Sequence, residues 1–215
     1  MMKGYLVVFI IAIVFCANTH PIAHYKELYA LVHSLTTKMK STSEAVELAG
    51  VFEQTETADS LQWLTQYYAS YCYVMGAFME ENPKHIDALA LKSKLALDIA
   101  EPLAEDISEI YCLRSLIASA RIMVDPESRG MKYGIESSTM LNKAKAANPN
   151  NPRVYLIEGQ SLLYTPDEYG GGCKNALPLF DEALARYQAF NLKSEVHPNW
   201  GKDEVLQLIE QCRSE

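Results

Sequence analysis

The stretch that decides the fold covers residues 152–190, PRVYLIEGQSLLYTPDEYGGGCKNALPLFDEALARYQAF. Within it, Ala176, Phe180 and Ala183 follow one another with spacings of four and three, so they share one face of a helix. Small residues let a neighbouring helix approach closely, and the large residue between them fills the gap. This small–large–small pattern predicts a helix that packs tightly against the helix before it.

The same pattern occurs twice more upstream, and each time a helix with aromatic residues precedes it. The three occurrences begin 44 and 39 residues apart. A recurring unit of this length is typical of stacked helical repeats. The two upstream sets are Ser93, Leu97 and Ala100, and Ser137, Leu141 and Ala144.

With Tyr155 and Gly159 in the preceding helix, the pattern resembles the tetratricopeptide repeat family. In that family the first helix carries an aromatic residue and a small residue four positions later, and the second carries the small–large–small set followed by proline. The resemblance covers residues 60–190, although Glu105 stands where the first repeat should have its proline. It implies an all-α, right-handed α-solenoid of antiparallel helix pairs, with about three repeats and extra helices at each end.

Apolar residues recur with the period of a helix through the rest of the chain, and no clear strand pattern appears. Asn82-Pro83 and the run from Asn148 to Pro152 are typical helix boundaries, since proline opens a helix and disfavours helix in the residue before it. The expected helices cover residues 23–36, 43–57, 60–80, 84–101, 107–123, 135–147, 152–164, 173–190 and 200–213.

The first nineteen residues have the pattern of a secretory signal peptide. Lys3 supplies a positive charge, and residues 6–17 form an uncharged apolar run of twelve. That run is shorter than the roughly 20 residues that span a bilayer, so we expect no transmembrane span in the mature chain. The predicted division is a signal peptide at residues 1–19 and a helical domain at residues 20–215.

The signal peptide predicts export to the periplasm or cell envelope. Cys16 follows the apolar run and raises the alternative of a lipoprotein. Lipoprotein signals typically have a small residue directly before the cysteine, whereas this chain has Phe15 there. Cleavage without lipidation is therefore favoured. The net charge of −8 argues against binding of nucleic acid or of an anionic membrane surface.

Five cysteines are scattered along the chain without a CxxC pair or zinc-ligand spacing. We therefore expect no metal site and no cofactor. Cys72 and Cys112 lie in apolar helical stretches and are predicted core residues. No compact catalytic signature occurs, so we expect a protein without enzymatic activity.

The chain also resembles exported, repeat-containing proteins of Bacteroidetes-type bacteria. Three segments carry that likeness. They are DPxSRGxKYG at residues 125–134, YTPxxYGGG at residues 164–172 and HPNWG at residues 197–201.

Two inserted loops, residues 125–134 and 165–172, are the predicted places for chemistry. Both follow the first helix of a repeat, so they should emerge at one end of the stack. One interpretation is structural, with glycines allowing tight turns and aromatic residues covering the ends. The other is a ligand or peptide site, in which the helix start after the glycines binds an anion. Its candidate residues are Arg129, Lys132, Tyr133, Tyr164, Tyr169, Gly170, Gly171, Gly172 and Trp200.

The resemblance to tetratricopeptide repeats implies a non-catalytic scaffold that binds a partner protein, as a peptide or helix, in a groove lined by the first helices. Tyr67, Tyr111 and Tyr155 mark that groove. The alternative is a small-ligand binding protein that uses the two loops. The tyrosine cluster around Tyr67 and Tyr71 fits peptide recognition, but core packing is the favoured interpretation.

Overall fold

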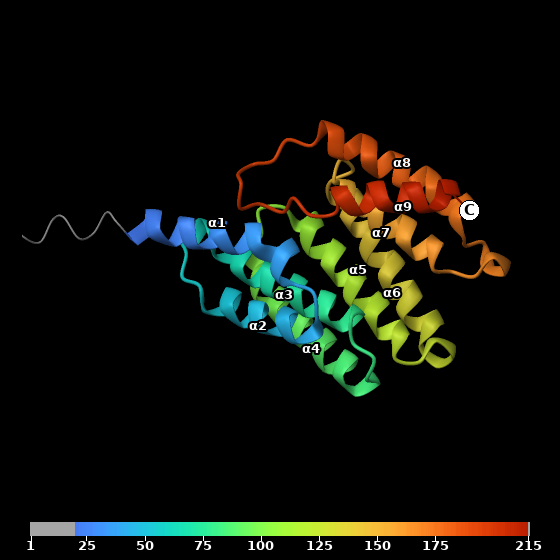
Figure 1. Cartoon of the computed structure of the whole chain (residues 1–215), viewed down its shortest axis with the longest axis horizontal. Coiled ribbons are helices and arrows are strands. Elements are labelled where there is room, and N and C mark those ends of the chain that lie inside the picture. The colour runs from blue at the N-terminus through green and yellow to red at the C-terminus, as the bar shows by residue number, and fades with distance from the viewer. Residues whose placement is uncertain (1–19, 215) are drawn as a thin grey trace, which may run out of the picture.

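The computed structural model describes residues 20–214, and the predicted signal peptide with Cys16 lies outside them. Within this range the chain is all α, with short 3-10 turns and no strand, which confirms the predicted fold class (Figure 1). The helices are α1 (His20–Lys38), α2 (Thr42–Gln54), α3 (Gln62–Phe78), α4 (Pro83–Ala100), α5 (Ile107–Met123), α6 (Pro126–Ala147), α7 (Pro152–Leu163), α8 (Cys173–Ala189) and α9 (Lys202–Ser214).

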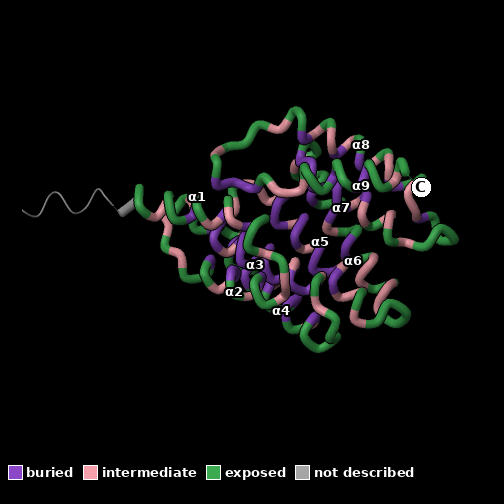
Figure 2. Tube along the Cα trace, viewed as in Figure 1, coloured by how far each residue is buried: buried purple, intermediate pink, exposed green. Residues whose placement is uncertain are grey.

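Helices adjacent in the sequence form the most extensive contacts. The pairs α3/α4, α5/α6 and α7/α8 pack side by side, α2 lies against α3, and α9 lies against α8. Among the first helices of these pairs, α5 also contacts both α3 and α7, and α4 packs on α5. Buried residues therefore concentrate where these helices meet, and exposed residues follow their outer faces (Figure 2).

All nine residues of the three small–large–small sets are buried, which confirms their predicted packing role. The Ser70 and Ser93 hydroxyls lie 2.8 Å apart across α3/α4, as do those of Ser115 and Ser137 across α5/α6. Between α7 and α8, a Cβ added at Gly159 would lie 2.5 Å from Phe180 Cε1. Small residues thus bring each pair of helices into close contact.

Capping hydrogen bonds are present at two of the predicted helix boundaries. The Asn82 side chain accepts a hydrogen bond from Lys84 N at the start of α4, and the Asn151 side chain accepts one from Arg153 N at the start of α7. In both helices proline follows the cap, where its missing N–H would have had no helical partner.

The predicted loop at residues 125–134 is wrong, because α6 begins at Pro126 and not at residue 135. Asp125 caps the helix, accepting hydrogen bonds from the amide and hydroxyl of Ser128. Gly130 and Gly134 have negative φ and lie inside the helix. A strong N-cap and a proline in the first turn outweigh the low helix propensity of two glycines.

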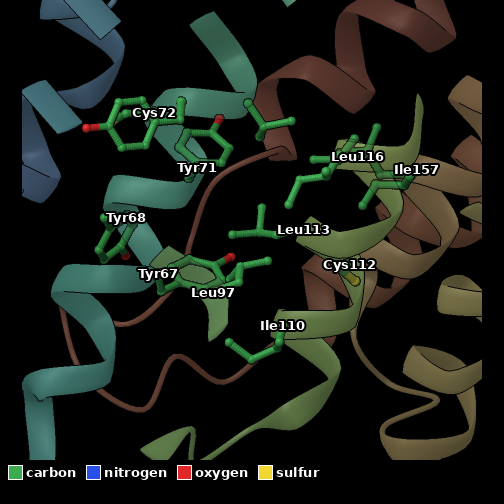
Figure 3. Close-up of a cluster of buried hydrophobic side chains, with 14 of the residues drawn as sticks. Tyr67, Tyr68, Tyr71, Cys72, Leu97, Ile110, Cys112, Leu113, Leu116 and Ile157 are labelled. Atoms are coloured by element: carbon green, nitrogen blue, oxygen red, sulfur yellow. The ribbon is translucent and has the colours of Figure 1, made fainter. Parts of the chain in front are cut away.

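The tyrosine cluster of α3 belongs to the core, which was the favoured interpretation of the sequence. Tyr67 and Tyr68 are completely buried, and Tyr71 and Tyr73 are nearly so. Tyr67 and Tyr71 point toward the apolar side chains of α5 (Figure 3). Cys72 and Cys112 are buried free thiols, which confirms them as core residues.

Cys173 and Cys212 form a disulfide that ties the start of α8 to the end of α9. It closes a loop between residues 39 positions apart, and such a crosslink stabilises a fold mainly by restricting the unfolded chain.

Gly134→Ala should raise the free energy of unfolding by about 0.5–1 kcal/mol, because a Cβ there meets no atom within 4 Å and alanine favours helix. Urea denaturation measures this change. Gly159→Ala is the matched control, and we expect a loss of about 1–3 kcal/mol because the added methyl overlaps Phe180. A destabilised Gly134→Ala variant would contradict the helical start of α6.

Candidate functional site

A segment between α8 and α9, residues 190–201, covers the face formed by α3, α5 and α7. We call this segment the strap (Figure 1). Tyr68 donates its hydroxyl proton to Val196 O at 3.0 Å, and Trp200 Nε1 donates to Tyr67 Oη at 2.8 Å. The Trp200 ring also lies 4.9 Å from the Tyr71 ring, measured between centroids. The strap is therefore anchored along α3.

A buried ion pair lies under the strap. Arg153 of α7 and Glu109 of α5 are 3.0 Å apart, and their side chains are 0% and 5% exposed. Glu109 also accepts hydrogen bonds from Tyr67 Oη at 2.9 Å and from Asn151 Nδ2 at 2.8 Å. Arg153 in turn donates to the carbonyl of Pro198 in the strap.

Burial and the opposite charge act against each other on both groups. Burial raises the pKa of Glu109, and Arg153 opposes that rise. Burial alone would lower the pKa of Arg153, but Glu109 and the weaker influence of Tyr187 and Tyr67 together outweigh burial, and the pKa is raised. The guanidinium also lies over the rings of Phe190 and Trp200, at 5.3 and 5.2 Å from their centroids. Each charge thus depends on the other and on the strap for compensation.

The strap covers the surface that the sequence analysis predicted to be an open partner groove. Tyr67 and Tyr155 were expected to line an open surface, but both are buried. Trp200 was expected beside the inserted loops, yet it packs among Tyr67, Tyr71 and Arg153. The face of α3, α5 and α7 is occupied by the chain's own backbone and is not open to a peptide.

The three candidate residues of the 125–134 segment lie on α6. Arg129 forms a two-pronged ion pair with Asp87 of α4, at 2.7 and 3.0 Å. Lys132 Nζ lies 5.0 Å from the centre of the Tyr133 ring. Arg129 is thus a clamp between α4 and α6, and its pKa is raised by the hydrogen bonds to Asp87.

The 165–172 loop holds the other candidates. Tyr164 and Tyr169 are 77% and 75% exposed. The three glycine N–H groups donate inside the loop: Gly170 N to Asp167 O, Gly171 N to Pro166 O and Gly172 N to Leu162 O. The Asp167 carboxylate lies against Gly172, within 2.2 Å of an ideal Cβ at that glycine. These N–H groups do not form the expected anion cradle, because they are already bonded and a carboxylate lies beside them.

A shallow pocket of about 530 Å³ lies beside this loop and the disulfide. Tyr164 and Gly172 line it, so the structure brings two of the candidate residues together there. The other candidates do not line it. Its lining consists of Leu163, Tyr164, Asp167, Gly172, Cys173, Lys174, Gln211 and Cys212.

A second hollow, which we call the cationic groove, runs between α4, α5 and α6 and has a volume of about 280 Å³. Four basic and two acidic residues line it, a local excess of +2 in a chain whose net charge is −8. Tyr111, Ile117 and Met140 supply its less polar surface. The charged lining residues are Lys94, Glu101, Arg114, Arg121, Glu136 and Lys143.

The four cations of the groove differ in how they are paired. Arg114 binds Asp98 and Glu101, and Lys94 binds Asp98 at 2.6 Å. Within residues 20–214, Arg121 and Lys143 form no ion pair. Their close partners are instead aromatic rings, Tyr133 at 5.6 Å for Arg121 and Tyr111 at 5.7 Å for Lys143. These two cations are available to an anion.

An apolar stripe on α4 adjoins the groove. Leu91, Leu95 and Ile99 recur every four residues and are each about half exposed. Lys94 lines the groove and lies three residues after Leu91. Residues three apart are neighbours on a helix surface, so the stripe runs along α4 beside the groove.

Sequence reasoning missed this groove. Tyr111 was expected in the partner groove of the first helices, whereas it lines the hollow between α4, α5 and α6. A signal was present, because Arg114, Ile117 and Arg121 follow helical spacing on α5, and Glu136, Met140 and Lys143 do so on α6. Only the packing of α4 and α6 on α5 brings these rows together.

Within the described residues, no cluster of histidine, cysteine, aspartate or glutamate side chains is placed to hold a metal ion. No helix in that part of the chain is long and apolar enough to cross a membrane.

Comparison with solved structures gives a match to the HusA haemophore from Porphyromonas gingivalis. The sequences are 36% identical and the TM-score is 0.77. The alignment covers 89% of this chain and 93% of the haemophore. That organism belongs to the Bacteroidetes, so the match supports the predicted likeness to helical proteins of this group, whereas membership of the tetratricopeptide family stays a prediction. No model of a known protein family and no curated protein matches the chain.

Arg153→Met should lower the free energy of unfolding by about 3–5 kcal/mol, because it leaves the Glu109 carboxylate buried without its charge partner. Urea denaturation followed by circular dichroism measures the loss. Arg213→Met is the matched control, since Arg213 and Asp181 pair at 3.0 Å on the surface and should contribute less than about 1 kcal/mol. Equal effects of the two substitutions would refute the structural role of the buried pair.

Proposed function

This chain belongs to the family of the HusA haemophore, and from that membership we propose that it binds haem as an exported carrier. The observation that carries the proposal is the 36% identity over nearly the full length of both chains. A haemophore carries haem, as its name says, and a carrier needs a binding surface but no catalytic step. The proposed role therefore includes no enzymatic activity.

The surface chemistry supports a ligand of this kind. Haem combines a flat apolar ring, two carboxylate groups and an iron atom that accepts tyrosine, histidine or methionine as axial ligand. Each of the two hollows has a tyrosine and at least one cation in its lining, Tyr111 in the cationic groove and Tyr164 beside the disulfide. Both are surface hollows that a ligand reaches from solvent.

The covered face of α3, α5 and α7 favours a small-ligand carrier over the scaffold that the repeat pattern implied. A scaffold would need an open surface there, and the strap fills that surface through Val196, Pro198 and Trp200. Ligand binding was the alternative interpretation of the sequence, and it agrees better with this arrangement.

Export is part of the proposal. The N-terminal segment has the charge and apolar run of a signal peptide. The Cys173–Cys212 disulfide adds support, because such bonds persist in oxidising compartments such as the periplasm and the extracellular space.

Titration of the mature chain, residues 20–215, with ferric haem tests the proposed function. We expect a saturable shift of the haem absorption band with a dissociation constant of about 1 µM or below, equivalent to about −8 kcal/mol. At a hundredfold excess over that constant, haem should also stabilise the fold by about 2.7 kcal/mol in a denaturation experiment. The control is the same chain in denaturing urea. A folded chain whose spectra never saturate, and match those of the unfolded control, would refute haem binding.

A further inference from the structure

We propose that the outer face of α4 and the cationic groove beside it form a docking surface for an acidic amphipathic helix of another protein. The apolar side chains of that helix pack on the apolar stripe of α4, and its carboxylates lie over the groove. This surface belongs to α4, α5 and α6, whereas the strap covers α3, α5 and α7. The partner is distinct from the haem of the proposed function, and neither proposal depends on the other.

The apolar stripe is exposed although it consists of large aliphatic side chains. Leu91, Leu95 and Ile99 are each about half exposed, and Leu103 continues their four-residue spacing into the turn after α4. Each step of four residues turns by about 40° around a helix, so the three stripe residues of α4 lie within an arc of about 80°. Burial of this surface against a second apolar surface is favourable. Contiguous exposed apolar surface of this kind is typical of protein interaction sites.

The shape of the stripe favours a helix as the partner. Residues four apart form a ridge on α4, and such a ridge fits between the ridges of a second helix. From Leu91 to Ile99 the ridge extends about 12 Å, which a facing helix of two to three turns matches. A β-strand partner would add to an unpaired strand edge, and no strand occurs among residues 20–214.

The charges of the groove select an acidic helix. Arg121 and Lys143 line the groove and form no ion pair among the described residues, since their close partners are tyrosine rings. The other two cations, Lys94 and Arg114, are already paired with carboxylates. The lining carries an excess of +2, so it attracts carboxylates and repels a basic helix. A helix with leucines on one face and glutamates beside them satisfies the stripe and the groove together.

Two other occupants fit this surface less well. Two copies of this chain related by a two-fold axis present the same patch to each other, so like charges are brought together. An anionic membrane attracts the cations of the groove, but it also meets the net charge of −8, which opposes adsorption. A single helix contacts only the stripe and the groove, so the acidic helix is the favoured partner.

The first test measures the binding of two labelled helical peptides to the haem-free mature chain, residues 20–215, by fluorescence anisotropy. Both peptides have about 18 residues, enough to form a helix, with leucines on one face. One carries glutamates beside the leucines, and the other carries lysines at the same positions. We expect the glutamate peptide to bind saturably and at least tenfold more tightly, with a smaller difference at high salt because the charges are screened. Equal or tighter binding of the lysine peptide, or no saturable binding of either peptide, would overturn the proposal.

The second test locates the bound peptide on the apolar stripe. Leu95→Gln removes the central side chain of the stripe and should lower the affinity for the glutamate peptide at least tenfold. Leu206→Gln is the matched control, because Leu206 of α9 is similarly exposed and lies outside the docking surface. This control should bind the peptide as the parent chain does.

The third test removes both unpaired cations in the double variant Arg121→Gln, Lys143→Gln. The glutamate peptide should bind at least tenfold more weakly, whereas the affinity for the lysine peptide should not fall. Lys132→Gln on α6 is the control for a general loss of charge, since Lys132 does not line the groove. Unchanged affinity for the glutamate peptide in this double variant and in Leu95→Gln would place the peptide elsewhere and contradict the proposal.

Two measurements on the parent chain test the other occupants. We expect a monomer in sedimentation equilibrium and no adsorption to phosphatidylglycerol vesicles. A dimer that Leu95→Gln dissociates, or adsorption that the double variant abolishes, would assign the surface to a second copy or to a membrane and refute the acidic helix. Thermal denaturation confirms that each variant is folded, as expected for side chains that are at least partly exposed. Haem is absent from every measurement, so a negative result leaves the proposed function intact.

Discussion

The ion pair of Arg153 and Glu109 is the interaction on which the arrangement of the whole protein depends. Two charges without solvent contact persist only if each compensates the other, and hydrogen bonds to their other polar atoms lower the cost of burial. Here such bonds come from α3 through Tyr67, from the start of α7 through Asn151 and from the strap through Pro198, while Arg153 Nε is buried with no hydrogen-bond partner among the described residues. The pair therefore fixes helices that are far apart in the sequence, and the strap completes its burial.

This constraint determines which surfaces are left for function. Because the strap packs over α3, α5 and α7, the face that a stack of helix pairs would offer to a peptide is already occupied. The opposite side of α5 stays open between α4 and α6, where the clamp of Arg129 on Asp87 joins these two helices. In an acidic chain this is where an excess of positive charge gathers, beside Tyr111.

The sequence predicted the parts of the fold that depend on local chemistry. The helix boundaries at Asn82-Pro83 and in the run from Asn148 to Pro152 were predicted, as were the small–large–small sets, because these features act within a helix or between neighbouring helices. The early start of α6 was missed, since Gly130 and Gly134 indicated a turn and the capping by Asp125 was not weighed against them. The pair of Glu109 and Arg153 was missed because 44 residues separate its members. The groove was missed because three helices contribute to it.

The most direct test of the account is to locate haem on the folded chain by nuclear magnetic resonance. Amide signals of the labelled protein are compared with ferric haem and with zinc protoporphyrin, since only the paramagnetic iron broadens the signals of nearby residues. We predict that the broadened signals belong to surface residues outside the strap, and that the strap keeps its signals because it stays packed on α3. Broadening centred on the strap and on the face of α3, α5 and α7 beneath it would contradict the account.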